Sequence, residues 1–170
     1  ITLIVDSTIL ICSEKLEGHI KYQLSSAIDS LSFSIVKKDN IESKFSLFGF
    51  CFNNNKHGIS YHSIGVNGAS VPSYLRCVNL EKQLNLMPPD LVIFSIGIKD
   101  AYENNFSKES FIKSYDTLIQ RIYSVNPEAA ILFTTNNDSY YQRKYPNERV
   151  YEAKEAMVYL AERKKLAIWD

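Results

Sequence analysis

The chain has 170 residues, of which 45% are hydrophobic and 22% are charged, and this profile fits one or two packed domains with a real core. Its 19 Lys+Arg and 19 Asp+Glu residues cancel, so no basic excess exists to bind a nucleic acid or an anionic membrane. Disorder and coiled coil are excluded by composition, and the longest apolar runs are far shorter than the about 20 residues that a bilayer span requires.

The first third of the chain has the period-two pattern of short strands. Apolar residues alternate with polar ones over residues 1–5, 31–35 and 45–52, and turn-forming residues separate these runs. We therefore predict a β-rich module of antiparallel strands over residues 1–57.

After Gly68 the pattern changes to helices that alternate with strands. Helical stripes are expected over 71–84, 111–122 and 150–160, and apolar strands over 91–95, 130–134 and 166–169. Together with a first strand over 59–64, this order predicts an α/β domain over residues 58–170, a three-layer parallel sheet with helices on both faces.

The three cysteines lie far apart in the sequence. Cys12, Cys51 and Cys77 lack the spacing of a zinc site or of a redox pair, so we expect no metal. Buried apolar thiols are the first interpretation, and a disulfide between Cys12 and Cys51 is the alternative.

A glycine-flanked loop precedes the first predicted helix. Gly65 and Gly68 flank Asn67, so backbone N–H groups and a side-chain amide could point together at an anion. The alternative is a plain strand-to-helix turn that needs glycine for its dihedral angles.

Polar residues also follow the next two predicted strands. Lys99 and Asp100 come after the strand over 91–95, either as functional groups or as a capping aspartate with a solvated lysine. Residues 136–141 either contact substrate or form a long loop. Because parallel strands end on one side of a sheet, we expect the segments 65–67, 97–100 and 136–138 to line one cleft.

The order of these motifs resembles the middle of an SGNH (GDSL-like) hydrolase. The resemblance rests on Gly65-Val66-Asn67-Gly68-Ala69, a helix, the strand of Pro89-Asp90-Leu91-Val92-Ile93, and the tip Gly97-Ile98-Lys99-Asp100. More narrowly, residues 58–69 resemble the cell-envelope branch that includes peptidoglycan and carbohydrate O-acetylesterase-like proteins. The match covers residues 58–170, and it implies that residues 1–57 are most of a β-rich insertion.

The resemblance implies an exported serine esterase, periplasmic or at the cell surface, although this sequence shows no signal peptide. It would hydrolyse acyl esters, chiefly O-acetyl groups, on a carbohydrate or peptidoglycan-type polymer without a cofactor. By this resemblance, Gly65 matches the glycine of the family's oxyanion hole, and Asn67 matches the loop that follows it. The second donor of the family's oxyanion hole is an asparagine, and Lys99 stands at its position. The residues expected on the substrate side are His62, Gly68, Gly97, Asp100, Tyr102, Asn136 and Asp138. For His62, a packed or rim histidine is the alternative.

The sequence departs from the family pattern at both ends of the motif order. Val5-Asp6-Ser7 lacks the glycine of Gly-Asp-Ser, so Ser7 is the weaker candidate nucleophile, and a first block upstream of Ile1 is favoured. No histidine follows His62, and no Asp-x-x-His is present. We therefore expect a fragment of a longer chain that is a poor esterase alone. The competing hypothesis is a non-catalytic glycan- or envelope-binding protein, and a nucleotide binder is disfavoured because glycine-rich phosphate loops are lacking.

Overall fold

The computed structural model describes residues 4–5, 8–9, 12–16, 19–26, 28, 30–32, 46–54 and 56–170. The chain divides into two compact units, Ile1–Ser60 and Tyr61–Asp170, and the boundary lies a few residues after the predicted one at His57. Among the described residues, none of the helices combines the length and the apolarity that a bilayer crossing needs.

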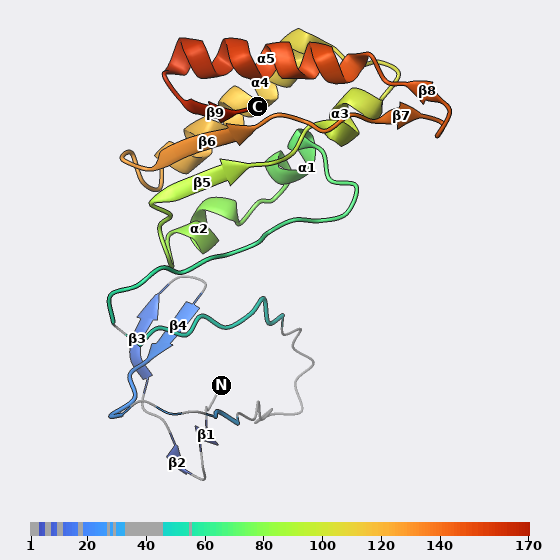
Figure 1. Cartoon of the computed structure of the whole chain (residues 1–170). Helices are drawn as coiled ribbons and strands as arrows, with labels where there is room; N and C mark the ends of the chain where they lie inside the picture. Colours follow the sequence, from blue (N-terminus) through green and yellow to red (C-terminus); the bar gives the residue numbers. More distant parts are fainter. Residues whose placement is uncertain are drawn as a thin grey trace. The chain divides into compact units, whose positions relative to one another are not determined.

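The described residues of the first unit form two short antiparallel hairpins (Figure 1). They are β1 (Ile4–Val5) with β2 (Thr8–Ile9), and β3 (Cys12–Leu16) with β4 (His19–Tyr22). The other two strands predicted here are wrong where the structure describes them, because residues 31–32 and 46–52 form no strand. An alternating pattern produces a strand only where a neighbouring strand pairs with it, and the structure shows no such partner for these described residues.

Two of the three cysteines also differ from the prediction. Cys51 and Cys77 are exposed, so the expectation of buried thiols is wrong for both of them. The side chain of Cys12 lies outside the described part of the chain.

The second unit is built on a parallel sheet with the strand order β5-β6-β9. Its strands are β5 (Leu91–Phe94), β6 (Ala130–Thr134) and β9 (Ala167–Trp169). Three predicted strands and their parallel direction are thereby confirmed. The fourth, over residues 59–64, is wrong: this segment is extended but unpaired, and Ile59 and Ile64 are exposed.

Five helices and one hairpin complete the described part of this unit (Figure 1). They are α1 (Val71–Leu75), α2 (Leu80–Leu84), α3 (Ile98–Tyr102), α4 (Lys108–Tyr123), α5 (Arg149–Lys164), and the hairpin of β7 (Tyr140–Tyr141) and β8 (Tyr145–Pro146). α4 packs against α1 and α5, and α3 packs against α5.

The helix predicted over residues 71–84 is interrupted between α1 and α2. The guanidinium of Arg121, on α4, donates to the carbonyls of Leu75 at 3.0 Å and Cys77 at 2.7 Å. Arg121 also forms an ion pair with Glu81. The carbonyls at the end of α1 therefore have a side-chain partner from α4, which replaces the amides that a continuous helix would supply.

The core lies on one face of the sheet. Phe94 and Phe133 contact the ring of Tyr115 on α4, with ring centroids 5.6 and 5.1 Å apart. On the opposite face Leu91, Ile93 and Trp169 are 53%, 50% and 70% exposed. The prediction of helices on both faces therefore does not hold for the described residues.

Candidate active site

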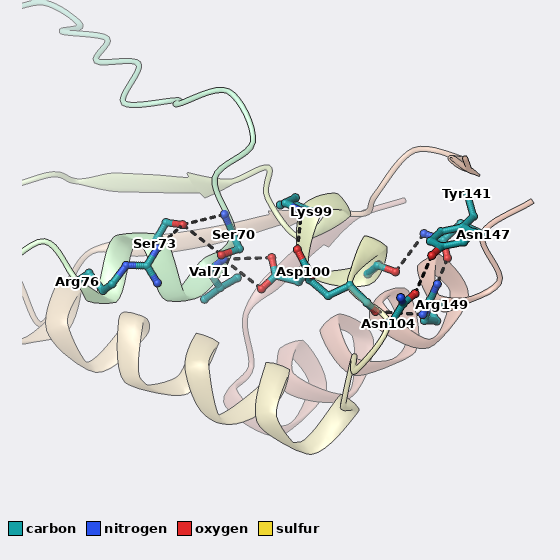
Figure 2. Close-up of polar contacts among 12 residues, drawn as sticks. Ser70, Val71, Ser73, Arg76, Lys99, Asp100, Asn104, Tyr141, Asn147 and Arg149 are labelled. Atoms are coloured by element: carbon teal, nitrogen blue, oxygen red, sulfur yellow. Dashed lines mark hydrogen bonds and ion pairs between the residues drawn. The ribbon is translucent and has the colours of Figure 1, made fainter. Parts of the chain in front are cut away.

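The loop before α1 and the tip of β5 are joined at the carboxyl edge of the sheet (Figure 2). The backbone N–H of Val71, the first residue of α1, donates to both carboxylate oxygens of Asp100, at 3.2 and 3.1 Å. Asp100 lies in α3, directly after the tip of β5. The segment 97–100 is therefore in direct contact with the start of α1, which follows the predicted segment 65–67.

The glycine-flanked loop is held at both of its ends. The hydroxyl of Tyr74 donates to the carbonyl of Ile64 at 3.2 Å, and Ser70 N–H donates to the hydroxyl of Ser73 at 3.1 Å. Between these anchors, Ala69 N–H donates to Val66 O at 3.0 Å and closes a turn.

Gly68 occupies the third position of that turn with φ +72°, a value that glycine adopts without strain. Gly65, Asn67 and Gly68 are exposed. Among the described residues none accepts from the Gly65 N–H or from the Asn67 amide, so both donors remain available to a ligand.

Asp100 is a half-buried carboxylate at the start of α1. Burial raises the pKa of Asp100, and the hydrogen bond from Val71 N–H opposes that rise. The arrangement corresponds to the capping alternative of the sequence analysis, with the difference that the capped helix is α1 and not α3.

Lys99 is directed along its own helix. Its Nζ lies 2.5 Å from a carboxylate oxygen of Glu103 and 5.6 Å from the ring centroid of Tyr102. The hydrogen bond to Glu103 raises the pKa of Lys99. The structure therefore places the ammonium group with Glu103 and not against the loop of Gly65.

The tips of β5 and β6 meet at Gly97, which has φ +133°. A Cβ atom there would lie 2.9 Å from Nδ2 of Asn136 and 3.1 Å from Cζ of Phe111. The amide nitrogen of Asn136 is buried and has no hydrogen-bond partner in the part of the chain that the structure describes. The hydroxyl of Tyr115 donates to Ile96 O at 2.6 Å and fixes the end of β5, and burial raises the pKa of Tyr115 well above its usual value.

The hairpin β7–β8 is fastened to α3 and to the residues after it. Tyr141 donates to Asn104 Oδ1 at 2.9 Å, and Gln142 N–H donates to the hydroxyl of Tyr102 at 3.2 Å. The buried side chain of Asn147 donates to Ala101 O at 3.1 Å. Tyr102 is among the residues predicted from the sequence, whereas Asn147 and the hairpin are not. The signal for the hairpin is three tyrosines around a polar turn.

The remaining predicted residues lie apart from these contacts. His62 is exposed in an unpaired segment and not on a strand, and Asp138 is exposed in the residues after β6. Ser7 lies outside the described residues. Within the described ranges, His, Cys, Asp and Glu side chains form no cluster suited to a metal ion.

The sequence matches no family model and no curated protein. The assignment of a function therefore depends on the motifs and on the geometry at the carboxyl edge of the sheet.

Proposed function

We propose that the protein is an exported serine esterase of the SGNH type that removes acyl groups, chiefly O-acetyl, from a carbohydrate or peptidoglycan-type polymer. The observation that supports this proposal most is the hydrogen bonding between Val71 N–H and the Asp100 carboxylate. It holds the start of α1, which follows the glycine-flanked loop, against α3, at the edge where parallel α/β sheets bind their ligands.

In this proposal the loop stabilises the negative oxygen of the tetrahedral intermediate. The Gly65 N–H and the Asn67 amide are the donors, since both are exposed and neither has a partner among the described residues. Asp100 is a positioning residue, because it contacts the first amide of α1 and through it the end of the loop.

The reaction follows the two steps of serine esterases. A serine Oγ attacks the acetyl carbonyl while a base takes its proton, and the sugar oxygen leaves with that proton. Water then attacks the acetyl-serine, which releases acetate and restores the serine. Ser7, which lies outside the described residues, is the weaker candidate nucleophile that the resemblance offers, and the chemistry requires no cofactor.

A second candidate function is glycan binding without ester cleavage. The ion pair between Lys99 and Glu103 favours it, because it holds the ammonium group away from the position where the family has its second oxyanion donor. Under this alternative the same edge of the sheet binds an acylated glycan that leaves unchanged.

Acetate release from an O-acetylated glycan by the natural protein tests the proposal. Asn67→Ala should lower kcat by about 10²-fold or more, the usual cost of one oxyanion donor. Asn85→Ala is the matched control, since Asn85 is an exposed asparagine at the end of α2 and precedes the amino end of β5. Equal rates for both variants, or no release by the protein, would contradict the proposal.

Lys99→Asn separates the two candidate functions. An asparagine restores the family's second donor, so an esterase that lacks this donor should gain up to about 10²-fold in kcat. A protein that only binds glycans gains no hydrolysis from this change.

A further inference from the structure

A cavity of about 350 Å³ opens beside the hairpin β7–β8. We call residues 140–146 the tyrosine hairpin. The cavity residues on which the inference depends are Tyr141, Tyr145, Pro146, Glu148, Arg149 and Glu152. Tyr145, which lines the cavity, is 54% exposed, so aromatic surface is available to a ligand.

The tyrosine hairpin is rigid and strained. Gln142 and Arg143, at the centre of its turn, have φ of +52° and +60°, values that cost about 1 kcal/mol or more in residues other than glycine. The hydrogen bonds of Gln142 to Tyr102 and of Tyr141 to Asn104 hold the hairpin against α3 and its end. A binding surface that is fixed in advance loses less conformational entropy when a ligand arrives.

Charged side chains of both signs surround the cavity. Glu148, Glu152 and Arg149 line it, and Arg143 and Lys144 lie in the turn of the tyrosine hairpin. Arg149 lies 5.3 Å from the ring centroid of Tyr141, and Lys144 lies 5.2 Å from that of Tyr145. Carboxylates and a guanidinium together offer hydrogen-bond acceptors and donors to a ligand with many hydroxyl groups.

We propose that the tyrosine hairpin is a subsite for a pyranose ring of a glycan chain. Such a ring has a flat C–H face that stacks on tyrosine, and it has hydroxyls that donate to carboxylates and accept from arginine. The hairpin is the next element after β6, and it is fastened to α3, the next element after β5. The inference rests on the proposed function in one respect: the glycan chain carries the ester that is hydrolysed at the glycine-flanked loop.

Titration of the protein with tetra-N-acetylchitotetraose, followed by ¹⁵N NMR, tests this subsite. The probe carries amides and no esters, so binding is measured without hydrolysis. Shift changes should concentrate at residues 140–149, and Tyr145→Ala should raise Kd about three- to tenfold, the contribution of one aromatic contact. Tyr145→Phe keeps the ring and should keep the binding.

The matched control is Tyr159→Ala on α5, where the tyrosine is 48% exposed and distant in sequence from the hairpin. Equal effects of Tyr145→Ala and Tyr159→Ala would overturn the subsite. So would the absence of shifts at residues 140–149 with the probe at about 10 mM, well above a millimolar Kd. Shifts at the hairpin without acetate release from an O-acetylated glycan would contradict the proposed function alone, and release without these shifts would contradict the subsite alone.

Discussion

Gly97, in the residues between β5 and α3, lies against the side chains of Asn136 and Phe111. Gly97→Ala should destabilise the protein by about 2 kcal/mol or more, because φ +133° is strained for alanine and the new methyl would meet Asn136 and Phe111. Urea unfolding measures this change. Gly65→Ala is the control, because the nearest neighbour of a Cβ atom there is Ser63 Oγ at 4.0 Å. The free energy of unfolding of this variant should change little. An equal loss of stability in the two variants would contradict the close approach at Gly97.

The pKa of Asp100 predicts a specific dependence of stability on pH. Burial raises this pKa above its ordinary value of 3.8, so the folded state holds the proton more tightly than the unfolded state. The contribution of Asp100 to stability is therefore full below pH 3.8 and is lost as the pH rises through the raised value. As the pH rises through that window, the free energy of unfolding of the wild-type protein should fall relative to that of Asp100→Asn.

Asp170 provides a control of opposite sign. Hydrogen bonds from Lys154 and Thr135 lower the pKa of Asp170, so its contribution is present above the unfolded value and lost as the pH falls. The stability of wild type relative to Asp170→Asn should therefore rise with pH. Unfolding curves of the three proteins between about pH 3 and 7 decide both predictions, and slopes of the same sign would contradict them.

At the scale of elements, the two faces of the sheet should differ in their contribution to stability. Phe133 is fully buried against Phe94 and Tyr115, and Phe133→Ala should cost about 3–5 kcal/mol. Ile93 on the opposite face is 50% exposed, and Ile93→Ala should cost less than about 1.5 kcal/mol. Chemical unfolding measures both costs, and equal values would mean that the protein covers this face in solution.

The turn of the tyrosine hairpin allows a stabilising change. Replacing Gln142 and Arg143 by Asn and Gly supplies the pair that tolerates two positive φ angles best, so stability should rise by about 1 kcal/mol. Thermal unfolding should show a midpoint about 2–4 °C higher, the shift expected for a chain of 170 residues. Arg143→Lys keeps the strained backbone and should leave the unfolding midpoint unchanged. A higher midpoint for this control would contradict the claim that the turn is strained.

The elements that could be predicted from the sequence are those in which the hydrophobic pattern of the segment matches the contacts that the segment makes in the fold. α4 and α5 have long helical stripes, and β5, β6 and β9 are short apolar runs after turn signals. Residues 59–64 alternate like a strand, but in the described structure no neighbouring strand pairs with them. The break between α1 and α2 depends on Arg121, which lies more than forty residues later, and no local pattern signals that contact.

At the scale of the whole molecule, the candidate site belongs to the unit Tyr61–Asp170. Motif order predicted its loop and the tip at Asp100, because parallel strands place their carboxyl ends on one edge. The partners of individual side chains could not be predicted. Lys99 pairs with Glu103, and Asn136 packs against Gly97, because these contacts depend on rotamers and on the packing of α3 and not on spacing.

The most direct test of the account is whether the backbone N–H of Gly65 takes part in ester hydrolysis. Gly65→Pro removes this donor, and Gly65→Ala keeps it in a place with room for a methyl group. Acetate release from an O-acetylated glycan by the natural protein should fall about 10²- to 10³-fold in kcat for the proline variant, with the alanine variant near wild type and both folded by circular dichroism. Equal rates for the two variants, or no acetate release by wild type, would contradict the account.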